Sequence, residues 1–280
     1  MEVIKADILG FCFGVRRAVE MAQKALDENV NASVYSLGPL IHNKTVLDSL
    51  SEKGLKVIGE EDISSLPSGS CVIIRAHGVP PKVIQLLEKQ NCKIVNATCP
   101  RVLKSQSIAM KGSEMGKLVV LAGDANHGEV QGIAGFAGKK FILVSDAKDA
   151  TLLSNPADPV LVFSQTTFSK TAFNDICEEL SKKTKNIEII NTICPATKER
   201  QDALEKLCRE VDAVLVVGGK TSANTIRLYQ NAASLVKEAW HIENAQEIPD
   251  EVYSYKKIGI TAGSSTPDQV IDDVIRVLAD

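Results

Sequence analysis

Three of the seven cysteines in this 280-residue chain share one sequence context. Cys99 in "NATCP" and Cys194 in "NTICP" each follow a hydrophobic run and precede a helical pattern, and Cys12 in "GFCFG" lies between two such segments as well. Successive members are about 90 residues apart. Three thiolates converging from three turns leave one position open on a tetrahedral zinc ion or on one iron of an iron–sulfur cubane. We therefore predict that these three cysteines are metal ligands.

The other four cysteines fit a structural role. Cys71 begins a strand-like run, Cys92 precedes one, and Cys177 and Cys208 fall within helical patterns. Because a buried cysteine most often behaves as a small hydrophobic residue, we assign all four to the core. The chain has no C-x-x-C motif, which disfavours a zinc knuckle or a thioredoxin-like pair.

Three histidines follow hydrophobic runs directly or after a short loop. They are His42 in "LGPLIHNK", His77 in "IIRAHGVPP" and His127 in "LAGDANHGEV". Histidines there can bind a metal, shuttle protons or donate hydrogen bonds to an anion. A single histidine in such a position is as often structural as functional, but three at equivalent positions favour a functional site. His241 in "EAWHIEN" lacks flanking glycines, and we assign it a structural role.

Two glycine turns carry hydroxyl and amide side chains instead. "GGKTSANTIRL" holds Ser222 and Asn224, and "ITAGSSTPDQV" holds Ser264, Ser265 and Thr266. Such residues at a helix start bind phosphate or simply cap the helix. Neither segment is a P-loop or a G-x-G-x-x-G fingerprint, so a nucleotide is not indicated. Together with the histidines they favour a small, strongly anionic ligand.

Glu129 lies two residues after His127 in a glycine-bounded loop. A carboxyl group there can deliver a proton, and Thr166 or Thr167 in "FSQTTFS" can relay or orient it. The alternative is a first-turn carboxylate that stabilises the helix dipole. The spacing alone leaves both interpretations open.

The elements that must position these residues alternate along the whole chain. Short runs rich in Val, Ile and Leu alternate with segments that are apolar at helical spacing, which predicts an α/β fold with mostly parallel sheets covered on both faces. The repeated cysteine turns divide the chain into three lobes, 14–97, 98–192 and 193–280. The third lobe has one strand too few, and we predict that the N-terminal segment 1–13 completes it. Sites in open parallel sheets lie at the carboxyl ends of strands, where the three cysteines fall.

Composition excludes several function classes. The chain is 44% hydrophobic and 24% charged, with a net charge of −3 and no basic block, so we expect no nucleic-acid partner. Its apolar runs are about 4–8 residues long, too short to span a membrane. We expect no signal peptide and a cytoplasmic location.

Eight motifs run in one order from residue 10 to about residue 267: "GFCFGVRRAV", "GPLIHN", "IRAHG", "NATCP", "NHGEVQG", "SQTT", "TICPAT" and "TSAN…RL". This combination resembles the 4-hydroxy-3-methylbut-2-enyl diphosphate reductase family, which acts last in the methylerythritol phosphate route to isoprenoids. The resemblance covers essentially the whole chain. It implies a trefoil of three α/β lobes around a central 4Fe–4S cluster that has three cysteine ligands and an open fourth iron.

The resemblance also implies roles for individual residues. Glu129 is the implied proton source, with Thr166 and His127 beside it, and the implied diphosphate pocket consists of His42, His77, His127, Thr166, Ser222, Asn224 and Ser265. The implied reaction is a two-electron reductive dehydroxylation that yields isopentenyl and dimethylallyl diphosphate, with flavodoxin or ferredoxin as electron donor. Where many members have two serines, this chain reads Ser222-Ala223, so one hydroxyl ligand is absent.

Two other functions use the same residues. A non-enzymatic iron–sulfur redox sensor or electron carrier would need protein ligands on all four irons, and only three cysteines are equivalent. A zinc hydrolase is the second alternative, since three sulfurs and an open position also suit zinc.

Overall fold

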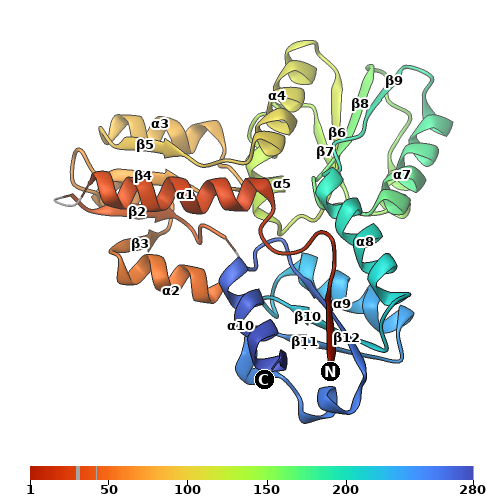
Figure 1. Ribbon diagram of the computed structural model, residues 1–280. Coiled ribbons are helices and arrows are strands. Elements are labelled where there is room, and N and C mark those ends of the chain that lie inside the picture. The colour runs from red at the N-terminus through yellow and green to blue at the C-terminus, as the bar shows by residue number, and fades with distance from the viewer. Residues whose placement is uncertain (30–31, 42, 280) are drawn as a thin grey trace. The chain divides into compact units, whose positions relative to one another are not determined.

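The computed structural model describes residues 1–29, 32–41 and 43–279. Within these residues twelve strands form three four-stranded sheets, and every strand pairing in them is parallel. The predicted α/β class with three lobes of parallel sheet is confirmed. Each sheet has helices on both faces (Figure 1).

The three sheets share one strand order. If the strands of a sheet are numbered along the chain, with β1 counted as the fourth strand of its sheet, they lie side by side in the order second, first, third, fourth. The first sheet contains β3 (Leu55–Ile58), β2 (Val34–Leu37), β4 (Cys71–Ile74) and β5 (Lys93–Asn96). The second contains β7 (Phe141–Val144), β6 (Leu118–Ala122), β8 (Val160–Ser164) and β9 (Ile187–Ile190). The third contains β11 (Glu238–Ile242), β10 (Ala213–Val217), β12 (Lys257–Ala262) and β1 (Glu2–Lys5). The N-terminal strand thus takes the fourth position in the third sheet.

Ten α-helices connect the described strands. They are α1 (Phe13–Glu28), α2 (Lys44–Glu52), α3 (Pro81–Lys89), α4 (Pro100–Glu114), α5 (Gly128–Ala134), α6 (Ala147–Leu152), α7 (Lys170–Lys183), α8 (Pro195–Cys208), α9 (Ala223–Leu235) and α10 (Asp268–Ala279). Three short 3-10 helices lie at Ile63–Ser65, Ala245–Glu247 and Asp250–Ser254. Cys12, Cys99 and Cys194 each directly precede a helix, as their shared context predicts.

The chain divides into two compact units. Unit 1 comprises Met1–Arg16, Ile41–Lys53 and Pro195–Asp280, and it holds the sheet that contains β1. Unit 2 comprises Arg17–Leu40 and Gly54–Cys194, and it holds the other two sheets. The lobe boundaries expected from the sequence stay a prediction.

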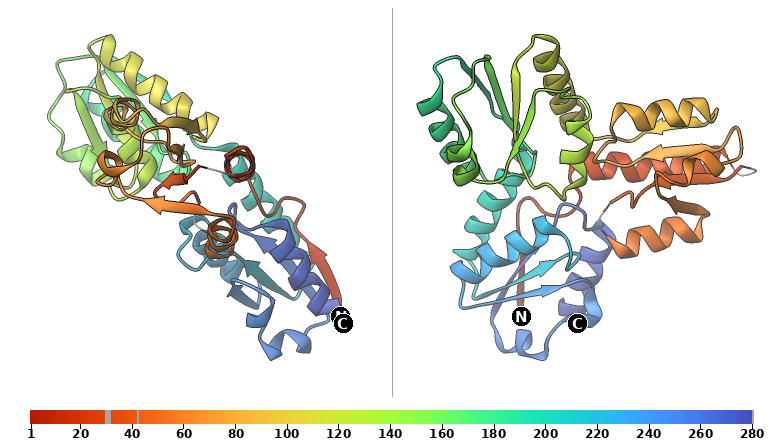
Figure 2. Two further views of the ribbon diagram at one scale, coloured as in Figure 1. Left: turned by 90° about the vertical axis from the view of Figure 1, so that its left-hand side faces the viewer. Right: turned by 180° about the vertical axis from the view of Figure 1, so that it is seen from behind.

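The core of unit 1 follows from the alternation of side chains along β10, whose five residues are all buried. Leu215 and its same-face neighbours pack with Ile271 and Val274 of α10, whereas Val214 and Val216 on the opposite face pack with α8 and α9. Figure 2 shows that β1 and α10, from the two ends of the chain, belong to this one unit. An uninterrupted apolar strand therefore supports helices on both sides.

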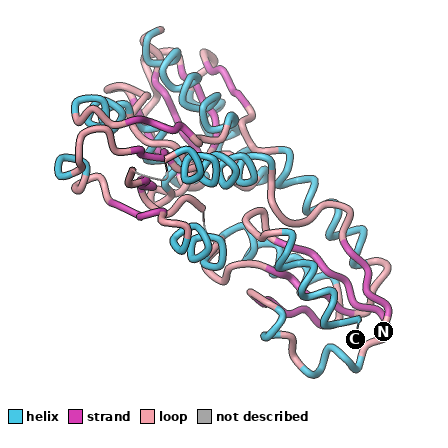
Figure 3. The backbone as a smooth tube through the Cα atoms, turned by 60° about the vertical axis from the view of Figure 1, so that its left-hand side comes forward, coloured by secondary structure: helices cyan, strands magenta, loops and turns pink. Residues whose placement is uncertain are grey.

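The sheets of unit 2 are built in the same way. β8 is buried along its whole length, and its residues contribute alternately to a core with α7 and a core with α4 and α5. β4 is equally buried, and Val72 and Ile74 pack with Val83 and Leu87 of α3. The strands and their flanking helices are distinguished by colour in Figure 3. Among the described residues, no helix combines the length and the apolar composition that crossing a membrane requires.

Candidate functional site

The predicted polar residues lie in loops at the carboxyl ends of the inner strands. In each sheet the strand order reverses between the first and third strands, and ligands of open α/β sheets bind beyond the carboxyl ends at such a point. In unit 2 these loops carry His77 after β4, His127 after β6 and Thr166 after β8. In unit 1 they carry Ser222 after β10 and Ser265 after β12. His42, in the segment after β2, lies outside the described residues.

The three cysteine turns share one backbone hydrogen bond. Each cysteine amide donates to the carbonyl two residues beyond the end of the neighbouring strand. The pairs are Cys99 N to Ala76 O at 2.9 Å, Cys194 N to Thr166 O at 2.7 Å and Cys12 N to Ser264 O at 3.0 Å. The repeated context predicts equivalent turns, and this repeated bond is their structural basis.

The Asn-x-x-Cys-Pro motif has a local physical cause. The Asn96 side-chain oxygen accepts the amide of Thr98, and the Asn191 oxygen accepts the amide of Ile193, both at 3.0 Å. Such Asx turns end a strand. Proline then occupies the first helical position, where its missing N–H costs nothing. The cysteine is left at the turn between the two.

Glu129 is a buried carboxyl group held by one partner residue. Its side chain projects from the first turn of α5, is 2% exposed, and accepts hydrogen bonds of 2.7 Å from both the backbone amide and the hydroxyl of Thr166. Burial raises the pKa of Glu129 to about 7, and the two hydrogen bonds from Thr166 oppose that rise. A carboxyl group with that pKa exchanges a proton readily near neutral pH.

The loop that precedes Glu129 fixes the tautomer of His127. The Glu129 amide donates to His127 Nδ1 at 3.2 Å, so in the neutral ring Nε2 carries the hydrogen and is a donor. The His77 ring meets the His127 ring edge to face, with centroids 5.3 Å apart. Two imidazoles are thereby held together beside the buried acid.

These contacts form a continuous series within unit 2. The Cys99 amide binds the residue before His77, and His77 contacts His127, which accepts from Glu129. Glu129 binds Thr166, whose carbonyl accepts the Cys194 amide. The structure therefore brings together every predicted site residue that it describes in unit 2.

Unit 1 carries the hydroxyl-rich part of the prediction. Asn224 donates to the Ser264 hydroxyl at 2.7 Å, which joins the loops after β10 and β12. Ser222 caps α9 by accepting the Thr225 amide at 3.4 Å, as expected of a plain N-cap. A Cβ atom at Gly263 would lie only 2.1 Å from Thr225 Oγ1, so glycine permits the close approach of these loops. Because the Ser264 carbonyl also accepts the Cys12 amide, the Cys12 turn lies beside the loop after β12.

The thiols separate into two groups. Cys12, Cys99 and Cys194 are half-buried, and none of the three forms a disulfide. Of the other four, Cys71 and Cys177 are buried, whereas Cys92 and Cys208 are half-buried rather than in the core. Burial raises the pKa of all four thiols, to about 11 for Cys177 and Cys208. Across the described residues no three histidine, cysteine or acidic side chains form a ready metal site, and Cys12 belongs to a different unit from the other two. Three accessible thiols with fixed backbones nevertheless match the donor set of an iron–sulfur or zinc centre.

Arg75 is a charged residue of the site that the sequence analysis did not single out. Cβ atoms at Gly38 and Gly128 would lie 3.0 and 2.8 Å from its two terminal nitrogens, so its guanidinium fits between two glycine backbones. Its Nε atom is buried and makes no hydrogen bond to any described residue. Burial lowers the pKa of Arg75, and Glu60 partly offsets this. Its position two residues before His77, directly after a buried strand, was the available signal.

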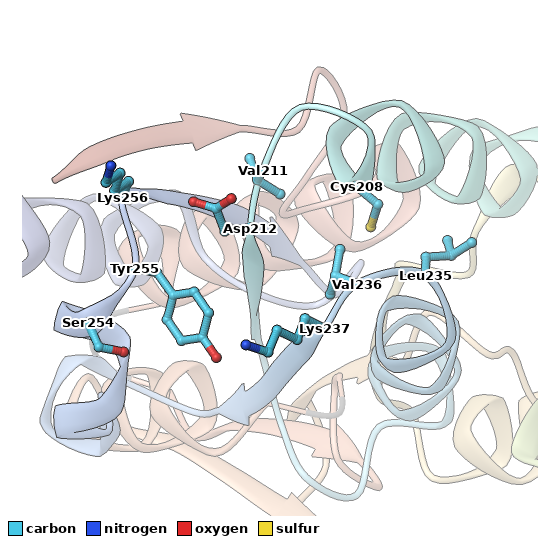
Figure 4. Close-up of a pocket in the computed structure, with 9 residues that line it drawn as sticks. All are labelled: Cys208, Val211, Asp212, Leu235, Val236, Lys237, Ser254, Tyr255 and Lys256. Atoms are coloured by element: carbon cyan, nitrogen blue, oxygen red, sulfur yellow. The ribbon is translucent and has the colours of Figure 1, made fainter.

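A cavity of about 620 Å³ lies at the opposite, amino-terminal edge of the sheet in unit 1 (Figure 4). Tyr255 and Lys237 point into it. Its lining residues are Cys208, Val211, Asp212, Leu235, Val236, Lys237, Ser254, Tyr255 and Lys256. It contains none of the predicted site residues.

The burial of Glu129 makes the stability of the protein depend on pH. Its folded-state pKa, about 7, lies above the ordinary value of 4.5, so between these values the folded chain holds a proton that the unfolded chain has lost. The unfolding free energy is therefore expected to fall by ~3 kcal/mol as pH rises from about 4.5 to about 7. Urea unfolding of the parent and Glu129→Gln proteins across that range measures this contribution. Identical pH dependence in both proteins would contradict it.

Taken together, the fold and the site define an α/β enzyme with a buried acid and polar loops at the carboxyl ends of its sheets. The sequence model of the LytB protein family matches residues 3–279. The 4-hydroxy-3-methylbut-2-enyl diphosphate reductase of Treponema denticola is 45% identical and covers 99% of each chain. That of Caldanaerobacter subterraneus subsp. tengcongensis is 41% identical over 99% of this chain and 96% of its own. The chain therefore belongs to the LytB protein family.

Solved structures agree with this assignment. A structure of (E)-4-hydroxy-3-methyl-but-2-enyl diphosphate reductase, described as the terminal enzyme of the non-mevalonate pathway, superposes with a TM-score of 0.79. It is 37% identical, with 100% of this chain and 99% of that chain covered. The Plasmodium falciparum E-1-hydroxy-2-methyl-but-2-enyl-4-diphosphate reductase has a TM-score of 0.90 at 28% identity, covering 100% of this chain and 88% of that one. The family is one of iron–sulfur enzymes.

Proposed function

We propose that this chain reduces 4-hydroxy-3-methylbut-2-enyl diphosphate to isopentenyl and dimethylallyl diphosphate, the last step of the methylerythritol phosphate pathway. The observation that carries the proposal is the series Glu129–Thr166–Cys194, in which one residue holds both a buried acid and a cysteine turn. Similarity to named reductases along the whole chain supports it. The reaction replaces a hydroxyl group by hydrogen, so it consumes two electrons and two protons and releases one water.

Cys12, Cys99 and Cys194 are the proposed ligands of one 4Fe–4S cluster whose fourth iron lacks a protein ligand. Their equivalent turns and half-buried positions suit a centre that must be reached by substrate. When bound, the cluster supplies the electrons one at a time and acts as a Lewis acid toward the substrate hydroxyl. Flavodoxin or ferredoxin is the proposed electron donor, and the cytoplasm the proposed location.

The proposed diphosphate ligands are His42, His77, His127, Thr166, Ser222, Asn224 and Ser265. His127 contributes an Nε2–H donor because its Nδ1 atom accepts the Glu129 amide. Asn224 and Ser264 hold the unit 1 loops together, and the Ser222 hydroxyl can donate while its oxygen caps α9. Arg75 adds a positive charge next to Gly128, the residue after His127.

Glu129 is the proposed proton source. When its carboxyl group is ionised, Thr166 Oγ1 donates to it at 2.7 Å. When it is protonated, the direction of this bond reverses, and the Thr166 hydroxyl hydrogen becomes available to another acceptor. A proton can thus pass from the carboxyl group through one hydroxyl without movement of the backbone. The described hydrogen bonds to the Glu129 carboxyl come from Thr166, and the Thr167 hydroxyl accepts from the Gln165 side chain at 2.7 Å.

Anaerobic turnover tests the proposal directly. The chain, reconstituted with iron and sulfide and supplied with a chemical reductant, is expected to convert the hydroxylated diphosphate to both products. A colourless zinc-containing protein that retains activity would rule out the cluster. A four-iron protein that cycles electrons but leaves the diphosphate unchanged would support the electron-carrier alternative.

Replacing Arg75 with methionine is expected to raise KM for the diphosphate about tenfold while changing kcat less, because one hydrogen bond to a charged group is worth about 1.5–3 kcal/mol. Steady-state kinetics at several salt concentrations measure this, and the variant is expected to show a weaker salt dependence. Arg209→Met, which removes an exposed charge just after α8, serves as the control. Equal KM values for the two variants would remove Arg75 from the binding site.

A further inference from the structure

The turn between β10 and α9 carries the chain to Ser222 and Asn224 at the start of α9. It comprises residues 218–221 and begins at Gly218, whose φ of +149° is a backbone conformation that residues with a side chain rarely adopt. A Cβ atom at Gly218 would also lie only 2.6 Å from Thr266 Oγ1. A turn of this unusual shape depends on the hydrogen bonds that its neighbours provide.

His241, the next-to-last residue of β11, binds the first residue of this turn. Its Nε2 atom lies 2.8 Å from the Gly218 carbonyl oxygen. Because a carbonyl oxygen can only accept, Nε2 carries the hydrogen and donates it. The Gly218 amide in turn donates to the Ile242 carbonyl at 2.8 Å. Both the N–H and the C=O of Gly218 are therefore held by β11.

The imidazole of His241 lies on the face of the sheet that α9 covers. His241 is in register with Val216, which packs with α8 and α9. Its ring contacts that of Tyr229 on α9, with centroids 5.8 Å apart and planes at 33°. The preceding residue, Trp240, faces the opposite core and contacts Tyr255 there. The strand and the helix thus hold the His241 donor in place from two sides.

Glu243 binds the same turn two residues further along the chain. Its Oε1 atom accepts the Lys220 amide at 2.8 Å. Glu247 supports this contact, since it accepts the Glu243 amide at 3.4 Å and forms an ion pair with the Lys220 ammonium group at 2.6 Å. The turn then reaches Ser222, whose amide donates to the Gly219 carbonyl at 3.0 Å. Two side chains from one segment of unit 1 therefore fix the turn at residues 218 and 220.

We propose that His241 and Glu243 are positioning residues for diphosphate binding, which hold the turn 218–221 so that Ser222 and Asn224 are presented to the anion. This inference rests on the proposed function, because it takes Ser222 and Asn224 as diphosphate ligands. An anion at a helix start is bound by hydroxyl, amide and backbone N–H donors. Binding is tighter when such donors are already ordered, because the ligand then does not have to order them. The sequence pattern of His241 is structural, and its contact with Gly218 gives that structure a purpose in binding.

The test uses the full chain, reconstituted anaerobically with iron and sulfide. His241→Phe removes the donor but keeps a ring against Tyr229, whereas His241→Gln restores an N–H donor. Glu243→Ala removes the acceptor, whereas Glu243→Gln keeps an amide oxygen. Trp240→Phe is the matched control, because it changes the neighbouring aromatic residue of β11 on the opposite face.

Four quantities are measured for each variant. The dissociation constant of inorganic diphosphate comes from anaerobic titration calorimetry, and kcat and KM for the hydroxylated diphosphate come from steady-state assays. Iron content reports the cluster, and the melting temperature reports stability.

His241→Phe and Glu243→Ala are each expected to weaken inorganic diphosphate binding and raise KM about three- to tenfold, because each loses one hydrogen bond that orders the turn. Their kcat is expected to stay within about twofold of the parent and their iron content to be unchanged. His241→Gln and Glu243→Gln are expected to recover most of the affinity. Trp240→Phe is expected to lower the melting temperature without changing the dissociation constant. Should His241→Phe fail to fold, His241→Leu, which also lacks the donor, replaces it, and the two Glu243 variants test the same turn independently.

The outcomes distinguish this inference from the proposed function. A parent chain that loads its cluster but neither binds inorganic diphosphate nor converts the substrate overturns both. A parent that converts the substrate, with His241→Phe and Glu243→Ala matching Trp240→Phe in dissociation constant and KM, overturns the positioning role alone. A loss of affinity in His241→Gln as large as in His241→Phe overturns the role of the hydrogen bond to Gly218.

Discussion

Replacing Glu129 with glutamine is expected to remove most turnover, about 10²–10⁴-fold in kcat, while the cluster and substrate affinity are retained. The amide is nearly the same shape, and its oxygen can still accept the Thr166 backbone N–H that Glu129 accepts now. It has no proton to give at neutral pH, so the chemical step loses its acid. Binding depends on other side chains and is expected to change little.

Single-turnover and steady-state assays under anaerobic conditions measure this effect, with iron content confirming the cluster. Glu210→Gln, at an exposed position after α8, is the matched control and is expected to retain parent activity. In the parent, kcat is expected to fall as pH rises through about 7, because the acid then loses its proton. Turnover by Glu129→Gln within twofold of the parent would remove Glu129 from the mechanism.

Replacing Cys12, Cys99 or Cys194 with serine is expected to reduce bound iron and activity to background. A serine hydroxyl keeps the size of the side chain, but it is a far poorer ligand for iron than a thiolate. Each variant also keeps the backbone amide that binds the neighbouring turn, so folding should survive. Iron and sulfide analysis, absorption spectra and anaerobic turnover measure the loss.

Cys177→Ala is the control for this series. Cys177 lies on the buried face of α7, where burial raises the pKa of its thiol to about 11, so its loss is expected to reduce stability modestly and to leave the iron content unchanged. A full cluster in any of the three serine variants would contradict the assignment of that cysteine. Loss of the cluster in Cys177→Ala, with the protein still folded, would show that the ligand set was chosen wrongly.

The sequence was most informative where structure depends on local pattern. Continuous apolar runs such as "AVLVV" at 213–217 predict strands buried on both faces, and β10 is buried throughout. The repeated Asn-x-x-Cys-Pro segments identified equivalent turns because an Asx turn followed by proline acts within a few residues. The count of strands also indicated where the N-terminal strand would pair, and β1 lies beside β12.

The spacing of residues along the chain does not predict contacts between distant segments. Thr166 and Thr167 were equal candidates in sequence, and only the packing of α5 against the loop after β8 places Thr166 against Glu129, 37 positions away. Spacing likewise did not decide whether Glu129 is a first-turn carboxylate that stabilises the helix dipole or a proton donor. In the fold, burial raises the pKa of Glu129 to about 7, which suits a proton donor. The sequence places Arg75 directly after a buried strand, but only the fold shows that its guanidinium fits between the backbones of Gly38 and Gly128.

The sequence by itself determined the alternation of strands and helices, the three cysteine turns and the family, because these depend on periodicity and turn chemistry within short windows. The tertiary structure alone decided which hydroxyl holds the acid, how far the acid is buried, and where the guanidinium of Arg75 lies. Those properties depend on side chains that meet across the fold, and on the removal of water from around them.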